Sequence, residues 1–126
     1  MKKLTYIDDL GNIHLVRGDT IGLKFQRKDT NDEVITEITQ QMWFTVKINT
    51  TMEDYEIQKT LGNGITFTEE DSYYHILINS NDTEDLKYME YHFDIQVENN
   101  GIVATIKRAK LIIEPEVTFE GGNNND

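Results

Sequence analysis

Cysteine is absent from the 126 residues of the chain, which excludes disulfides, zinc–thiolate sites and a cysteine nucleophile. Proline occurs once, at Pro115, and no apolar run is long enough to cross a membrane as a helix. The opening residues Met1-Lys2-Lys3 lead into a mixed polar segment that lacks the apolar core of a signal peptide. We therefore expect a protein that folds in a cytoplasm, without disulfides and without membrane association.

Basic residues are also scarce. The chain has 12 Lys and Arg against 23 Asp and Glu, which gives a formal net charge of −11. The phosphates of nucleic acids and of anionic membranes would be repelled by such a charge at long range. We therefore predict no nucleic-acid partner and no membrane partner, and we interpret the acidity first as a feature that favours solubility.

Segments with helical periodicity are lacking, and apolar residues alternate with polar ones instead. In the clearest example, Tyr91, Phe93, Ile95 and Val97 are separated by polar residues. Period-two alternation is typical of strands with one buried face, and it recurs over residues 21–25, 42–48 and 74–78. Roughly seven to nine short strands separated by polar turns predict an all-β, Ig-like antiparallel β-sandwich, with a closed barrel as the alternative.

We predict one folded domain with short extensions at both ends. Residues 1–12 form an N-terminal arm or weak strand, residues 13–118 form the β-sandwich, and residues 119–126 form a flexible polar tail. The tail is rich in Asn and Gly and has no apolar surface to bury. One short helical turn is expected near residues 82–88, because the Asn and Asp at its start suit the capping position of a helix.

Asn100-Gly101 joins the strand that contains Val97 to a second apolar strand, and this dipeptide is typical of a tight hairpin turn. Two registers are consistent with it. A two-residue loop places Val97 opposite Ala104 and needs a β-bulge near Lys107-Arg108, because the later apolar residues have the opposite parity. A three-residue loop places Val97 opposite Val103 and needs no second bulge, so we favour it.

No catalytic, cofactor or metal site is predicted. The imidazoles of the chain are His14, His75 and His92, and no third ligand lies at a spacing typical of zinc sites. We expect His75 and His92 on a solvated face. Nothing in the sequence matches a nucleophile elbow or a phosphate-binding loop. We therefore predict a protein that is not an enzyme and needs no cofactor.

Trp43 is the side chain that most strongly indicates a binding surface. It alternates with Met42 and Phe44, so we expect it on the outer face of its strand. An outward tryptophan is typical of a subunit interface, a small second core under a loop, or a platform on which a sugar stacks. With three tyrosines added, the candidate interface comprises Trp43, Tyr55, Tyr73 and Tyr88.

The order of several short motifs resembles that of one known family. The motifs are Arg17-Gly18-Asp19-Thr20 before IGLKF, then MWFTVKI and GNGITF, Asp82-Thr83 with Leu86 behind it, the strand from Tyr91 to Val97, Asn100-Gly101, and AKLII before Pro115. Together they cover roughly residues 13–118. In this order they resemble the N-terminal domain of phage baseplate upper proteins and related small tail structural proteins of phages and prophages.

The resemblance implies an Ig-like β-sandwich that attaches parts of a phage tail to one another and has no catalytic residues. It also implies that Leu86 plugs one end of the sandwich. A location in the virion follows, after synthesis in the host bacterial cytoplasm, with other tail proteins and copies of the same chain as partners. The alternative function is a carbohydrate-binding module that recognises a host cell-surface glycan through Trp43 and nearby tyrosines.

Overall fold

The computed structural model describes residues 4–116, which form nine strands and one short helical turn. This confirms the all-β class, and the number of strands falls within the predicted range. The elements are β1 (Tyr6–Ile7), β2 (Ile13–Val16), β3 (Ile21–Gln26), β4 (Gln41–Lys47), β5 (Ile57–Leu61), β6 (Gly64–Thr68), β7 (Tyr73–Ile78), α1 (Ser80–Thr83), β8 (Glu90–Asn99) and β9 (Ile102–Glu114).

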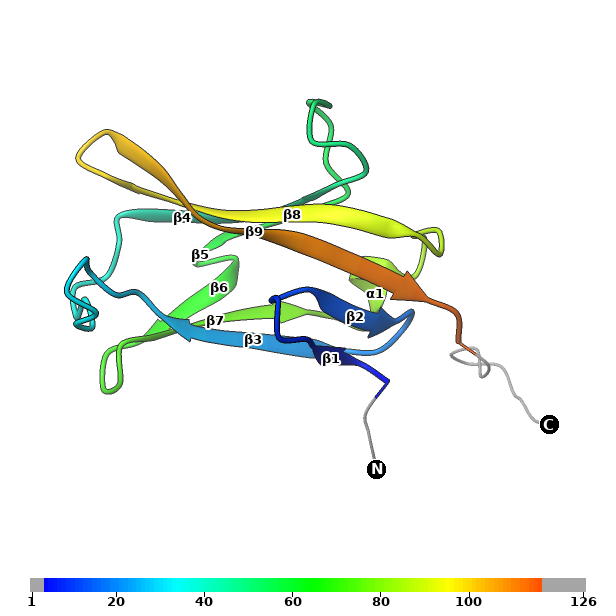
Figure 1. Ribbon diagram of the computed structural model, residues 1–126, viewed down its shortest axis with the longest axis horizontal. Helices are drawn as coiled ribbons and strands as arrows, with labels where there is room; N and C mark the ends of the chain where they lie inside the picture. The colour runs from blue at the N-terminus through cyan, green and yellow to red at the C-terminus, as the bar shows by residue number, and fades with distance from the viewer. Residues whose placement is uncertain (1–3, 117–126) are drawn as a thin grey trace.

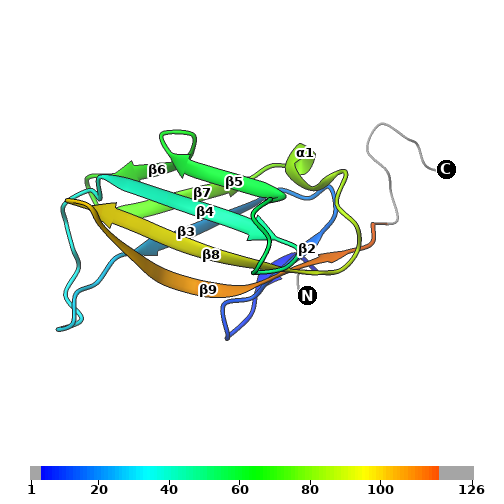
Figure 2. The same cartoon turned by 90° about the horizontal axis from the view of Figure 1, so that it is seen from above.

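All nine strands belong to one sheet that curls on itself into a nearly closed, barrel-like shape (Figure 1). The order of hydrogen-bonded neighbours is β1-β2-β9-β8-β4-β5-β6-β7-β3. In Figure 2, β9, β8, β4 and β5 lie side by side in one wall, and β7 and β3 lie in the wall behind them. The two ends of the order, β1 and β3, are edges of the sheet, so the ring of strands is incomplete.

Two of the strand pairings are parallel, so our prediction of a purely antiparallel sheet is wrong in this respect. β2 runs parallel to the end of β9, where Ile13 pairs with Leu111 and Val16 with Glu114. β5 and β6 run parallel only over a short contact beside the turn at Gly62. The pairing of β2 with β9 brings the beginning of the domain to its last strand and thereby joins the two walls.

The core lies between the two walls, as the alternating pattern predicts. Tyr91, Phe93, Ile95 and Val97 of β8 are all buried, and the rings of Phe93 and Phe44 lie 5.2 Å apart, measured between centroids. The other buried apolar residues of this core are Ile13, Leu15, Leu23, Met42, Val46, Ile57, Ile65, Tyr74, Ile76, Ile78, Leu86, Leu111 and Ile113. Residue 48, which we placed in the strand of β4, is instead exposed beyond its end.

The hairpin of β8 and β9 has the two-residue loop, so the register that we favoured is wrong. Val97 pairs with Ala104 and not with Val103. Both loop residues have positive φ, 53° at Asn100 and 81° at Gly101. This conformation is the one that a type I′ turn requires, and it matches the twist of the two strands that the turn joins.

A β-bulge in β9 restores the parity of the later apolar residues. Gln96 pairs with Thr105, and the next pair is Ile95 with Lys107. Ile106 is therefore the extra residue, one position before the site that we expected for this register. Bulges are common where a strand has no second neighbour, because the distorted ladder then disturbs only one pairing.

The helical turn lies earlier than predicted. α1 spans Ser80–Thr83 rather than residues 82–88. The backbone N–H of Asn79 donates to the carboxylate of Asp82 at 2.7 Å, so Asp82 lies within the first turn and does not precede it. The predicted tail, residues 119–126, and the last two residues of the predicted domain lie outside the described residues.

Candidate binding site

The incomplete closure of the sheet leaves a slot between β3 and β9. β3 pairs with β7 along one edge and, in the described part of the chain, with no strand along the other. β9 pairs with β8 along most of its length, but its second edge meets β2 only from Leu111 to Glu114. At Lys110, the backbone N–H donates to Asn12 Oδ1 at 3.0 Å. Residues 102–109, which we call the free half of β9, therefore have one open edge.

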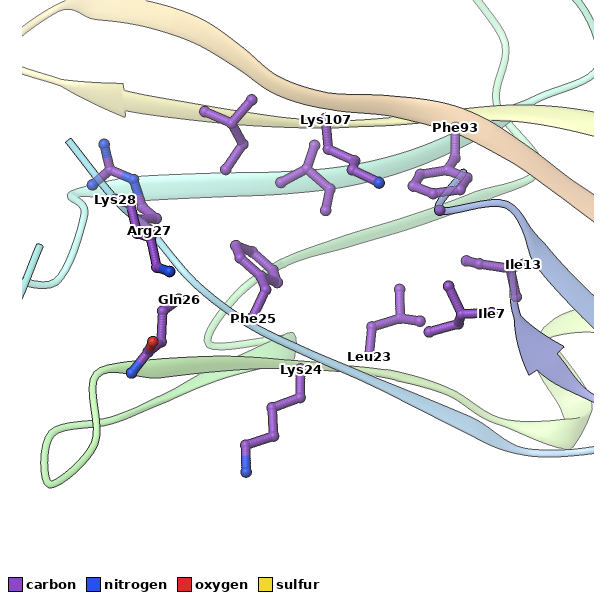
Figure 3. Close-up of a pocket in the computed structure, with 13 residues that line it drawn as sticks. Ile7, Ile13, Leu23, Lys24, Phe25, Gln26, Arg27, Lys28, Phe93 and Lys107 are labelled. Atoms are coloured by element: carbon purple, nitrogen blue, oxygen red, sulfur yellow. The ribbon is translucent and has the colours of Figure 1, made fainter. Parts of the chain in front are cut away.

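The slot leads into a cavity of about 380 Å³ (Figure 3). The apolar residues that line it are Ile7, Ile13, Leu23, Phe25, Phe93, Ile95 and Ile106. The bulge contributes to this lining, because two consecutive residues of β9, Ile106 and Lys107, both face the cavity. The volume lies in the range of ligand-binding pockets, about 300–1,000 Å³.

The charged side chains that line the slot are all basic. They are Lys24, Arg27, Lys28 and Lys107. Figure 3 shows Lys107 directed into the cavity from β9, Arg27 and Lys28 at the end of β3, and Lys24 directed away. Lys28 lies 3.8 Å from Asp32, whereas Arg27 and Lys107 have no ion-pair partner within residues 4–116. The slot is thus a locally cationic, apolar site on a protein whose net charge is −11.

The turn between β1 and β2 borders the slot and is held by Asp8. The Oδ1 atom of Asp8 accepts hydrogen bonds from the backbone N–H groups of Leu10 and Asn12, both at 2.9 Å. Its Oδ2 atom lies 2.8 Å from Nε2 of His14, and this hydrogen bond is the main reason that the pKa of Asp8 is lowered to about 2. Gly11, with φ of 86°, packs directly against the ammonium group of Lys107.

The free half of β9 exposes apolar side chains to solvent. Ile102, Val103 and Ile106 are 74%, 54% and 40% exposed, whereas Leu111 and Ile113 further along the same strand are 0% and 2% exposed. Exposed apolar residues beside an open strand edge are typical of places where another strand adds to a sheet. The slot therefore combines an open backbone edge, an apolar cavity and two cations, Arg27 and Lys107, that form no ion pair in the described part of the chain.

The four residues of the predicted interface lie on separate elements. Trp43 is half-buried on the outer face of β4, between β5 and β8. Tyr73 is on β7 in the other wall, and the ammonium group of Lys24 on β3 lies 4.4 Å from the centroid of its ring. Tyr55 and Tyr88 are exposed and lie in the connections that lead into β5 and β8. That these residues form an interface stays a prediction.

Tyr88 takes part in a contact that ties the end of β9 to the segment before β3. The guanidinium carbon of Arg17 lies 4.3 Å from the centroid of the Tyr88 ring. Arg17 Nε also donates to Oε1 of Glu116 at 2.8 Å, and this hydrogen bond is the main reason that the pKa of Arg17 is raised. Stacking and charge pairing therefore give Tyr88 a structural role in this arrangement.

The histidines are dispersed over the fold. His75 of β7 lies 3.0 Å from the hydroxyl of Thr68, and His92 belongs to β8 in the opposite wall. Within residues 4–116, no group of three or more His, Asp or Glu side chains is placed to hold a metal ion. In the same part of the chain, no helix has the length and apolar character needed to cross a membrane.

The chain matches no protein-family model, and a search of curated proteins found none with a similar sequence. The resemblance to phage tail proteins therefore stays a prediction, and the slot provides the main structural argument about function.

We did not predict this slot from the sequence. Two features of the sequence could have indicated it. Apolar residues occur at both odd and even positions between Ile102 and Ile106, and the basic pair Lys107-Arg108 follows them in an acidic chain. The three-residue loop that we favoured concealed them, because it needs no bulge at this point.

Proposed function

We propose that the chain is a non-catalytic structural module of a phage or prophage virion, which acts through protein–protein contacts in the baseplate or tail. The observation that carries the proposal is the free half of β9, an exposed apolar strand whose open edge borders a cavity. Main-chain hydrogen bonds along an open edge give a partner affinity, and pockets beside it give specificity. The Ig-like relationship implied by the sequence belongs to the same proposal.

The virion location is tested by following the protein itself. Mass spectrometry of phage particles purified from the strain that encodes the chain should detect it, and antibodies against the pure protein should label the tail in electron micrographs. Protein that stays in the lysate and is missing from the particles would contradict the proposal. A non-virion protein from the same cells, carried through the same purification, is the control for contamination.

Assembly of several copies is also part of the proposal. Cyclic oligomers bury matching patches on each copy, and Trp43 is the outer aromatic side chain that we assign to such a patch. Light scattering of the pure protein should therefore give a mass above that of one chain. A monomer at high concentration would exclude self-assembly, but attachment to other tail proteins would survive that result.

A carbohydrate-binding module is the second candidate function, and the position of Trp43 favours it. Its ring lies on the outer face of β4, where it pairs with Thr60 and is flanked by Gln96, two polar side chains that suit hydroxyl groups of a sugar. A glycan array that compares the natural protein with Trp43→Ala tests this function. Binding that is unchanged in the variant would eliminate Trp43 as a sugar platform.

A further inference from the structure

We propose that the slot between β3 and β9 binds an extended, acidic segment of a partner protein, which adds to the free half of β9 as a further strand. This inference rests on the proposed function as a protein–protein attachment module and specifies the chemistry of the partner. The backbone, the cavity and the charges of the slot each contribute one requirement.

The backbone requires an extended segment. Along residues 102–109, the edge of β9 that faces away from β8 forms no strand pairing within the described residues. Each unpaired N–H and C=O group on such an edge is a site for a main-chain hydrogen bond, and only an extended chain can use consecutive sites. The contact with Asn12 at Lys110 sets the end of the available edge.

The cavity requires apolar side chains at alternate positions of the incoming segment. In a strand, successive side chains point to opposite faces, so every second residue of a segment beside β9 points toward the cavity. There it meets Leu23, Phe25 and Ile106, which line the slot from both sides. Burial of such residues provides the main favourable free energy of binding, at about 25 cal/mol for each Å² of apolar surface.

The charges require acidic residues in the segment. Lys107 projects into the slot from β9, and Arg27 lies at its edge near the end of β3 (Figure 3). Neither cation has an ion-pair partner within residues 4–116, so a carboxylate that reaches the slot replaces no existing ion pair there. Opposite charges at such a site add to affinity and to the association rate.

The same charges disfavour a second copy pairing through the same edge. Two copies of β9 side by side would bring two Lys107-Arg108 pairs into one ladder, in a complex of two chains that each have a net charge of −11. Like charges on neighbouring strands destabilise a sheet. A small amphiphile would fill the cavity but would leave the exposed edge at Ile102 and Val103 unused.

Fluorescence anisotropy with a synthetic peptide tests the proposal. The probe is a fluorescein-labelled, terminally blocked peptide of sequence TVTETVT, in which the two valines and the glutamate between them share one face of the strand, so the carboxylate points toward the cavity that Lys107 enters. We expect saturable binding of this peptide, no binding of the matched peptide TVTKTVT, and loss of binding when alternate amides of the acidic peptide are methylated. Amide NMR signals of residues 102–109 should shift on titration, because the added strand bonds to that edge.

Two neutralising variants provide the matched comparison. Lys107→Gln should weaken peptide binding by about tenfold, because it removes the cation that faces the cavity. Lys110→Gln removes the same charge from the same strand, but Lys110 points outward, where its ammonium lies 3.2 Å from Glu90, so peptide affinity should stay unchanged. Arg27→Gln repeats the test from the β3 side, and circular dichroism verifies that each variant is folded.

Other outcomes overturn the proposal. Equal weakening by Lys107→Gln and Lys110→Gln would show a general charge effect, and NMR shifts confined to other strands would move the site elsewhere. Binding of decanoate without binding of the peptide would identify a site for small amphiphiles. Dimerisation that Lys107→Gln abolishes would identify a second copy as the occupant.

The failure of this proposal can be distinguished from the failure of the virion function. If particles contain the chain while the peptide fails to bind, the slot proposal fails and the virion function stands. If the peptide binds to a chain that is missing from particles, only the virion function fails.

Discussion

The two halves of β9 are continuous in sequence but differ in almost every physical respect. Residues 110–114 lie between β8 and β2, with Leu111 and Ile113 buried in the core. Residues 102–109 pair on one edge only, and Ile102, Val103 and Ile106 are exposed. The bulge at Ile106 lies within the half that has no second neighbouring strand among residues 4–116. One strand therefore both closes the domain and presents an open edge to solvent.

This difference separates the residues that maintain the fold from those that are available for binding. Apolar side chains in the paired half contribute to stability by burial, whereas those in the free half leave most of their surface in water. An open, apolar edge is a liability for a protein that needs no partner, because such edges promote aggregation. Basic residues beside it, Lys107 and Arg108, reduce that risk and select which partner can approach.

The largest effect expected from this comparison is on stability. Leu111→Ala should lower the free energy of unfolding by about 2–5 kcal/mol, because it leaves a cavity in the middle of the core. Ile102→Ala, a change of similar size in the free half, should alter it by less than about 0.5 kcal/mol. Urea denaturation of both variants measures the difference. Similar losses in the two variants would mean that the free half is packed in solution and would remove the contrast between the halves.

A smaller loss is expected at the hairpin turn that leads into the free half. Gly101 has φ of 81°, a conformation in which a side chain is strained, and a Cβ atom there would meet no neighbour within 4 Å. Gly101→Ala should therefore cost about 1 kcal/mol through backbone strain alone. Gly22→Ala in β3 is the control, since Gly22 also has open space but lacks a positive φ. Thermal unfolding measures the melting temperature of both variants. Equal melting temperatures would contradict a stability cost from backbone strain at Gly101.

The sequence predicted the buried features of this molecule better than the exposed ones. Alternation in β8 and β4 correctly identified core residues such as Phe93 and Phe44, because burial on one face imposes a period of two. The predicted register of β9 was wrong because the free half of this strand has no buried face. Without a buried face, the apolar pattern does not specify the length of the loop or the presence of the bulge at Ile106. The slot depends on how distant strands meet, which local pattern does not encode.

The bulge provides the next test, with an effect on binding that exceeds its effect on stability. Deletion of Ile106 should leave every other pair of the ladder in place, because Thr105 and Lys107 already face adjacent residues of β8. Stability should change by less than about 1 kcal/mol, since the residue is exposed. Affinity for the acidic peptide should fall by about tenfold, because the slot loses one apolar wall.

Ile106→Ser keeps the bulge and removes the apolar group, so it separates the two contributions to binding. Peptide anisotropy and urea denaturation on the same samples measure both quantities. A deletion variant that unfolds would show that the bulge supports the fold, whereas full peptide affinity in Ile106→Ser would show that the apolar wall does not matter.

The smallest effect is expected from Asp8, which holds the turn beside Lys107. Its pKa in the folded protein is lowered to about 2, mainly by the hydrogen bond with His14, whereas an aspartate in an unfolded chain titrates near 3.9. A lowered pKa means that the ionised group stabilises the fold, so this contribution is fully present above about pH 4 and is lost as the pH falls toward 2.

Asp8→Asn lacks that contribution at every pH. The free energies of unfolding of the natural protein and the variant should therefore differ at pH 6 and converge between pH 4 and pH 2, which urea denaturation at each pH measures. Asp9→Asn is the control, because it removes the same charge one residue away. Curves that stay parallel down to pH 2 would show that the charge of Asp8 does not hold the turn. Convergence specific to Asp8 would show that one border of the slot depends on an ionised carboxylate, while the paired half of β9 depends on burial.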